Sequence, residues 1–79
     1  MLDPDLDTPV YLQLAGILRG QIRSGELQPR RPIPSIRTLQ QRYEVSDGTV
    51  KKAVQLLRDE GLVRTVKGRG VYVVEKLPE

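Results

Sequence analysis

The stretch from Ser46 to Gly61 constrains the fold more than any other part of this sequence, because it combines both helix-end signals with a helical apolar pattern. Ser46 can accept a hydrogen bond from the first turn of a helix, and Asp47 suits the positive end of the helix dipole. Gly61 readily adopts the left-handed conformation that ends helices. Four apolar residues between these ends share one helix face: Val50, Ala53, Val54 and Leu57. The stretch therefore predicts an amphipathic helix.

The other side of this predicted helix is polar and mostly cationic. It carries Lys51, Lys52, Gln55 and Arg58. A short helix with one apolar face and one cationic face is typical of an element that lies in a groove of nucleic acid. The pattern thus indicates a recognition helix.

Composition excludes several classes of function. The 79 residues contain no Cys and no His, which excludes disulfides, thiolate or histidine zinc sites and a histidine general base. So short a chain buries about 60–65% of its unfolded surface and leaves little room for a ligand cavity. We therefore expect no enzymatic activity, no cofactor and no small-molecule site. No apolar run approaches the ~20 residues of a membrane span, and no signal peptide is recognisable. We expect a cytoplasmic, nucleoid-associated protein.

The positive charge lies in the second half of the chain. Residues 30–70 hold ten basic and four acidic side chains, whereas residues 1–29 hold two basic and four acidic ones. Such a basic region is expected where a protein meets a polyanion, although a solvated basic surface is the alternative.

The first part of the chain predicts an acidic arm followed by a helix. Residues 1–8 are irregular and acidic, and Thr8 followed by Pro9 is a favourable helix start with a capping hydroxyl. An apolar stripe continues to Ser24, and Gly25 follows. We expect the first helix at residues 9–24.

Three prolines at positions 29, 32 and 34 then favour extended backbone, which could include a short edge strand at residues 31–33. Ser35 is a second helix cap, and the apolar spacing predicts a second helix that begins at residue 36 and ends at residue 42 or 43. Only Glu44 and Val45 separate it from Ser46, so the second and third helices form a helix-turn-helix. We assign six residues to the core: Tyr11, Leu39, Tyr43, Val50, Val54 and Leu57.

The end of the chain predicts a hairpin. Residues 62–66 and 71–74 are rich in β-branched residues, and Lys67–Gly70 between them is a turn with two cations and two glycines. The predicted fold is a winged helix-turn-helix, mainly α with a small β-hairpin. It comprises three helices and a C-terminal two-stranded wing over residues 9–75, with a tail at 76–79.

Several motifs in register resemble the N-terminal winged-helix DNA-binding domain of the GntR family of bacterial transcription regulators. The resemblance covers residues 9–74. Val10–Gln13 is similar to the family's Leu-Tyr-x-Gln, and Ile33–Leu39 to its Leu-Pro-Ser-x-Arg-x-Leu. Val45–Val50 is similar to its Val-Ser-x-x-Thr-Val. Two shorter stretches also fall where the family has them: Gly61–Val63 and Gly68–Gly70. The resemblance implies sequence-specific binding of double-stranded DNA for transcriptional regulation. The third helix would enter the major groove and the wing the adjacent minor groove.

The sequence departs from this family pattern at specific places. Asp47 stands where the family commonly has an arginine that contacts DNA, and Gly48 where a longer or hydroxylated residue is common. Arg30 replaces a usual glycine, and Gln40 a usual alanine. The family's C-terminal effector-binding and dimerising domain does not follow the wing, so the sequence is expected to be either an excised domain or a small regulator.

The predicted DNA contacts come from the second helix, the third helix and the wing. They are Arg37, Ser46, Asp47, Gly48, Thr49, Lys51, Lys52, Lys67, Gly68 and Arg69. Arg37 can bind phosphate or guanine, its alternative being a surface pair with Glu44. Arg69 would suit a narrow minor groove, unless the tip is a simple turn. Gln55 and Arg58 are expected to touch phosphate or solvent.

Two partners follow from this interpretation: double-stranded DNA, and a second copy of the chain or a separate protein. The alternative function is a winged-helix protein-interaction module that binds DNA weakly or not at all. Three features favour that alternative: Asp47, the acidic arm and the lack of an effector domain after the wing.

Overall fold

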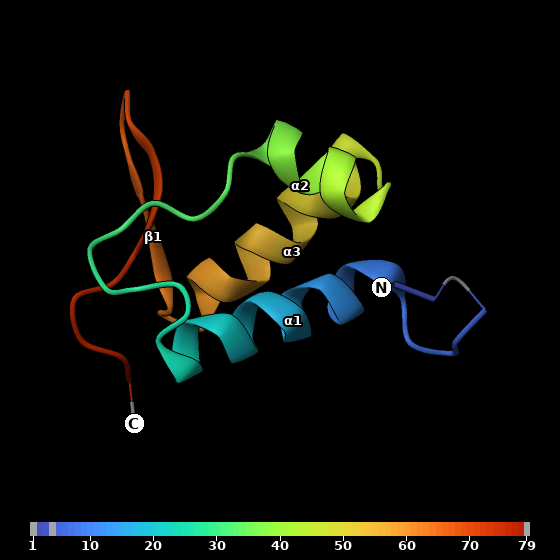
Figure 1. Ribbon diagram of the computed structural model, residues 1–79, viewed down its shortest axis with the longest axis horizontal. Coiled ribbons are helices and arrows are strands. Elements are labelled where there is room, and N and C mark those ends of the chain that lie inside the picture. The colour runs from blue at the N-terminus through green and yellow to red at the C-terminus, as the bar shows by residue number, and fades with distance from the viewer. Residues whose placement is uncertain (1, 4, 79) are drawn as a thin grey trace.

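The computed structural model describes residues 2–3 and 5–78 and contains three helices followed by a two-stranded antiparallel hairpin (Figure 1). Met1 and Pro4 of the predicted arm and Glu79 of the predicted tail lie outside the described residues. The elements are α1 (Val10–Ser24), α2 (Ile36–Tyr43), α3 (Asp47–Asp59), β1 (Val63–Val66) and β2 (Gly70–Val73). The predicted winged helix-turn-helix is confirmed.

Serine caps begin α2 and α3 in the same way. The Ser35 hydroxyl oxygen accepts a hydrogen bond from the Thr38 backbone N–H at 3.1 Å, and Ser46 accepts one from Thr49 at 3.1 Å. Each serine hydroxyl also donates to the threonine hydroxyl at 2.9 Å. Because the caps satisfy N–H groups that have no partner inside the helix, both predicted starts are confirmed.

The predicted cap of α1 is wrong. Pro9, not Thr8, is the cap residue; its backbone is extended (φ −53°, ψ 145°), and no side chain hydrogen-bonds the first turn. Thr8 lies one residue too far out, and its carbonyl oxygen instead accepts a hydrogen bond from the Gln13 side chain at 2.9 Å. The same amide group bonds both backbone polar groups of Asp3. Gln13 thereby attaches the described part of the N-terminal segment to α1.

The end of α3 has the hydrogen bonds of a Schellman motif. Gly61 has φ 77°, and its N–H donates to the Arg58 carbonyl at 3.0 Å. The Leu62 N–H donates to the Leu57 carbonyl at 3.0 Å. This pair of bonds requires a left-handed residue after the cap, which explains the glycine and confirms the predicted helix end.

The core lies where α1 and α3 cross and where α2 and the hairpin cover them. Its buried residues are Leu14, Ala15, Leu18, Ile22, Ile33, Leu39, Val50, Ala53, Val54, Leu57, Leu62, Val63 and Val73. The apolar stripe of α3 is buried along its whole length, as its spacing predicts. Tyr11 and Tyr43, predicted as core, are only half-buried and pack against its edge.

The hairpin has a regular register and a third backbone neighbour. Val63 pairs with Val73 and Val66 with Gly70. On the other edge of β2, the Ile33 N–H donates to the Val71 carbonyl at 2.9 Å, and the Val73 N–H donates to the Arg31 carbonyl at 2.9 Å. The predicted edge strand at 31–33 is thus a single bridge, at Pro32, rather than a full strand. The ladder does not continue, because the Arg31 N–H bonds the Gln28 carbonyl within the link, at 3.2 Å, and not β2.

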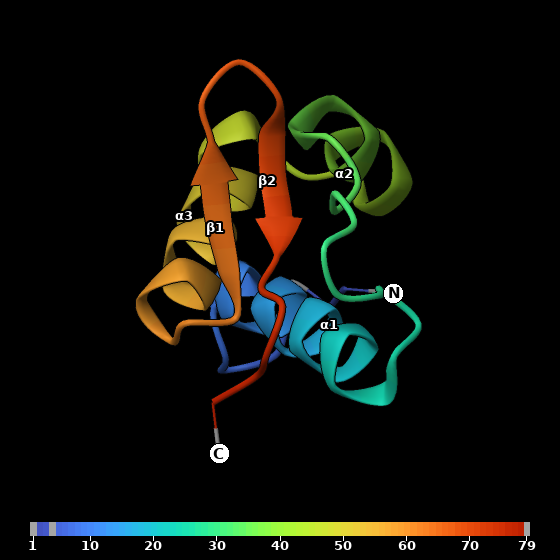
Figure 2. The same ribbon diagram turned by 90° about the vertical axis from the view of Figure 1, so that its left-hand side faces the viewer.

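The arrangement gives the molecule two distinct ends. The tip of the hairpin, α2 and the N-terminal end of α3 lie at one end, and the C-terminal end of α1 lies at the other (Figures 1 and 2). Three parts of the chain that are separate in sequence therefore lie at the same end of the molecule.

Candidate nucleic-acid interface

The N-terminal end of α3 carries an ion pair that the spacing of its residues permits. The Lys51 ammonium lies 2.9 Å from the Asp47 carboxylate, one helical turn away, and the two side chains are 63% and 53% exposed, respectively. Exposure keeps such a pair weak, so water or a ligand can replace either partner. Side by side, Lys51 thus offers hydrogen-bond donors and Asp47 offers acceptors to a partner.

The three other predicted residues at this end leave room for close approach. Ser46 and Thr49 are engaged with each other through the cap, and Gly48 has open space where a Cβ atom would lie. The open space at Gly48 leaves room for a partner to approach the N–H groups at the start of α3.

Arg37 is exposed in the first turn of α2. Among the described residues it forms no ion pair, so the alternative pairing with Glu44 is not observed. Its guanidinium group is available to a partner outside the chain.

Lys52 lies apart from Lys51. Its ammonium stands 4.6 Å from the centroid of the Tyr11 ring on α1, a cation–π contact. The sequence placed both lysines on one cationic face, but adjacent residues of a helix differ in direction by about 100°. The structure therefore brings Lys51 toward the wing and Lys52 toward α1.

A hollow of about 330 Å³ separates α3 from the wing, and we call it the inner hollow. It is lined by Ile36, Lys51, Val54, Gln55, Arg58 and Val71. Arg58 donates to the Gln55 side chain at 2.6 Å, while its buried Nε has no partner in the described structure. The sequence predicted that Gln55 and Arg58 touch phosphate or solvent but not that they line a hollow, because the hollow depends on how the hairpin packs against α3.

The wing tip is a tight turn with cations on both sides of a glycine. The Arg69 N–H donates to the Val66 carbonyl at 2.9 Å, and Gly68 has φ 79°. A positive φ at this position fits a type II turn, which explains the glycine. Lys67, Gly68 and Arg69 are all exposed.

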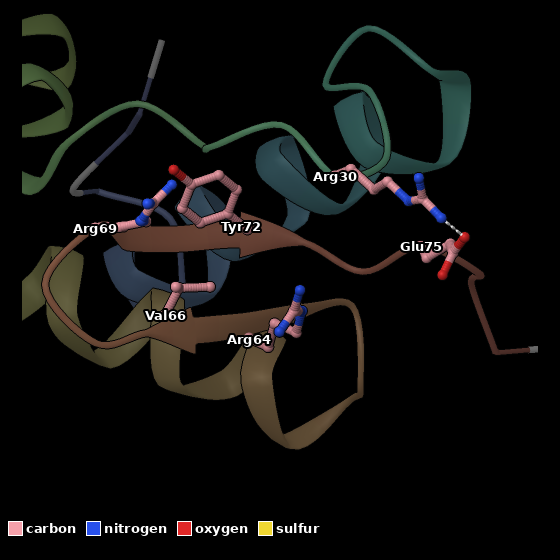
Figure 3. A pocket seen from close by; sticks show the side chains of 6 residues that line it. All are labelled: Arg30, Arg64, Val66, Arg69, Tyr72 and Glu75. Carbon is pink, nitrogen blue, oxygen red and sulfur yellow. Dashed lines mark hydrogen bonds and ion pairs between the residues drawn. The ribbon is translucent and has the colours of Figure 1, made fainter.

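The side of the hairpin that faces away from the core carries a second hollow of about 260 Å³, which we call the outer hollow (Figure 3). It is lined by Arg30, Arg64, Val66, Arg69, Tyr72 and Glu75. Arg30, from the link between α1 and α2, forms an ion pair with Glu75 after β2. Tyr72, whose ring position sequence patterns could not specify, lies here beside Arg69.

The perturbed pKa values belong to an ion pair outside these surfaces. Hydrogen bonds from Arg19 hold the pKa of Glu60 below its usual range, and Arg23 adds a smaller charge effect in the same direction. The same hydrogen bonds, which Arg19 donates, raise the pKa of Arg19. This pair joins α1 to the end of α3, so it serves the fold.

Comparison with known proteins identifies the family. Residues 10–73 match the sequence model described as bacterial regulatory proteins, gntR family. The chain belongs to the gntR family. Because this is a family of regulatory proteins, membership agrees with the prediction of a non-enzymatic function.

Individual gntR relatives match nearly all of the chain. It is 43% identical over 65 residues to the transcriptional repressor NagR of Bacillus subtilis, covering 82% of the chain and 27% of NagR. It is 34% identical over 74 residues to the repressor YtrA of the same species, covering 94% of the chain and 57% of YtrA. The chain thus spans from about a quarter to just over half the length of these relatives.

A solved structure shows the same fold on DNA. The DNA-binding domain of AraR in complex with operator ORR3 has a TM-score of 0.83 and 31% identity, over 94% of this chain and 89% of that one. A further AraR complex, with operator ORX1, has a TM-score of 0.86.

Residues 2–3 and 5–78 lack two further features. These residues hold no helix that is both long and apolar enough to cross a bilayer. They also hold no cluster of three or more potential metal-binding side chains.

Proposed function

We propose that this chain binds double-stranded DNA sequence-specifically as the DNA-binding domain of a bacterial transcription regulator. One observation carries the proposal: α2, the N-terminal end of α3 and the tip of the hairpin lie at one end of the molecule (Figures 1 and 2). Arg37 is an exposed residue of α2. The likeness to AraR bound to operator DNA supports it. Residues 9–75 would form the binding domain, with residues 1–8 as an arm and 76–79 as a tail.

The N-terminal end of α3 would enter the major groove. Ser46, Gly48 and Thr49 would let the backbone approach a phosphate, and Arg37 would hold a phosphate or guanine beside it. Lys51 can donate to guanine while Asp47 accepts from cytosine N4, so the ion pair would read base edges as a unit. Lys52, at the α1 side, would touch the sugar–phosphate backbone only.

The wing would enter the adjacent minor groove through Lys67, Gly68 and Arg69. One DNA strand must then cross the inner hollow, since that hollow separates α3 from the wing. Lys51 and the partly buried Arg58 guanidinium line its polar side. Both groups are suited to phosphate oxygens.

A salt titration tests the proposal. Binding to a duplex selected from a random pool should fall steeply as salt rises, because each phosphate contact releases counterions. Substituting Arg37 by Gln should weaken this binding, whereas Arg23→Gln, in the last turn of α1, should leave it unchanged. Absence of binding at low salt to both selected and random duplexes would contradict the proposal and favour the protein-interaction alternative.

Regulation in the cell is the finer part of the proposal. A single copy should bind with a dissociation constant near the ~10⁻⁴–10⁻⁶ M of non-specific contacts. We propose that two copies bind paired half-sites as a homodimer, which would bind more tightly than one copy. This binding would take place in the cytoplasm, at the nucleoid.

A further inference from the structure

The outer hollow is a cationic surface that none of the predicted DNA contacts except Arg69 uses. Arg64 and Tyr72 face each other across the two strands, and both point away from the core because their neighbours Val63 and Val73 point into it. The hollow of about 260 Å³ lies between these side chains and Arg30 (Figure 3).

Its charge is unbalanced. Glu75 is paired with Arg30, and among the described residues neither Arg64 nor Arg69 forms an ion pair. Arg64 is exposed, and the half-buried Tyr72 ring forms one side of the hollow. Two guanidinium groups beside a phenol hydroxyl offer several donors and no competing carboxylate other than the one held by Arg30.

The geometry of a minor groove supplies the matching anion. A groove is bounded by two strands, so a hairpin whose tip enters it has one strand on each side. The strand on the α3 side meets the inner hollow. The other strand must pass the outer face of the hairpin, where Arg64 lies two residue pairs from the tip-proximal Val66–Gly70 pair.

We propose that the outer hollow binds phosphates of the far strand of this minor groove, with Arg64 as its principal contact and Tyr72 as a further hydroxyl donor. The inference rests on the proposed function and extends it. The wing would then be held between two strands, and the DNA footprint would reach beyond the groove that the tip enters.

The test compares two duplexes that share one selected site. The longer duplex continues about five base pairs, half a helical turn, past the wing's minor groove, and the shorter one ends within that groove. The variants of the 79-residue chain are Arg64→Gln, Arg64→Lys and the matched control Arg23→Gln. Thermal unfolding by circular dichroism checks that each is folded.

We expect Arg64→Gln to bind the longer duplex about three- to tenfold more weakly and to reduce the slope of log K against log salt by about one. Arg64→Lys should retain the slope. The unaltered chain should lose similar affinity on the shorter duplex, where Arg64→Gln should lose nothing further.

Two results would overturn the inference, and they are distinguishable. If the unaltered chain binds both duplexes but Arg64→Gln matches Arg23→Gln on each, the outer hollow binds no DNA. If the unaltered chain binds neither duplex at low salt, the proposed function fails and this inference fails with it.

Discussion

Asp47 introduces a carboxylate at the end of α3 where the family pattern commonly has an arginine. Its carboxylate offsets the charge of Lys51 at the proposed DNA-facing end of α3. We predict that Asp47→Asn strengthens binding to random duplexes a few-fold, because the Lys51 charge is no longer offset and a repulsion of phosphate disappears. It should also remove any preference for cytosine that depends on the carboxylate. Selection from a random duplex pool, followed by titration, measures both effects.

The control for this change is Asp59→Asn at the opposite end of α3. It removes the same charge from the same helix but lies outside the first turn. Equal effects of the two variants would mean that net charge alone matters. Unchanged affinity and preference for Asp47→Asn would rule out a role in recognition.

Arg30 adopts a left-handed conformation, with φ 65°, in the link between α1 and α2. A side chain with a Cβ atom is strained there, which is consistent with the glycine usual at this position in the family pattern. We predict that Arg30→Gly is more stable than Arg30→Ala by about 0.5–1 kcal/mol. Both variants lose the ion pair with Glu75, so the difference isolates backbone strain. Denaturant unfolding measures it, and equal stability would show that the link relaxes.

At the scale of elements, a part-buried ion pair joins α1 to the residue that follows α3. Arg19 donates two hydrogen bonds to the Glu60 carboxylate, at 2.7 and 2.6 Å. The side chains are 32% and 31% exposed, so solvent weakens the pair. We predict that Glu60→Gln lowers the free energy of unfolding at pH 7 by about 1 kcal/mol.

The pH dependence of this difference follows from the lowered pKa of Glu60. The stabilisation is complete above the pKa of the unfolded state, about 4.3, and is lost as the pH falls through the lower pKa of the folded state. The two proteins should therefore become equally stable in acid. The control is Glu26→Gln, which removes an exposed carboxylate from the link after α1. It should leave the free energy of unfolding unchanged at pH 7 and at pH 2. If the unaltered chain and Glu60→Gln still differed in free energy of unfolding at pH 2, the ion pair with Arg19 would not be the cause of the difference.

Element positions could be predicted from the sequence, because Ser35, Ser46 and Gly61 act locally and the apolar stripe of α3 repeats with the helical period. Side-chain partners could not. Thr8 is not the cap of α1, because Pro9 is extended and takes the cap position. The Thr8 carbonyl instead accepts a hydrogen bond from the Gln13 side chain, which sequence spacing does not reveal. The two hollows were not foreseen either, since both depend on contacts between residues far apart in sequence. Charge counts showed that the second half of the chain is basic, but not which side of the wing carries the basic side chains.

For the whole molecule, the surface available to one copy limits affinity. We predict that a duplex with two half-sites spaced by one helical turn, about 10–10.5 base pairs, binds two copies more tightly than a duplex with one half-site. Sedimentation of the complexes measures the stoichiometry. A duplex with the half-sites shifted by half a turn is the control, because it places the copies on opposite faces. Equal affinity for all three duplexes would show that the copies bind independently.

The backbone bonds between β2 and the link at 30–33 have a consequence for how the wing opens. Because Arg31 and Ile33 bond the far edge of β2, the hairpin cannot separate from the helices without releasing the link between α1 and α2. The Val73 amide, which donates to Arg31, should therefore exchange its hydrogen only when the molecule unfolds globally. The wing should therefore have the same conformation before and after it contacts DNA.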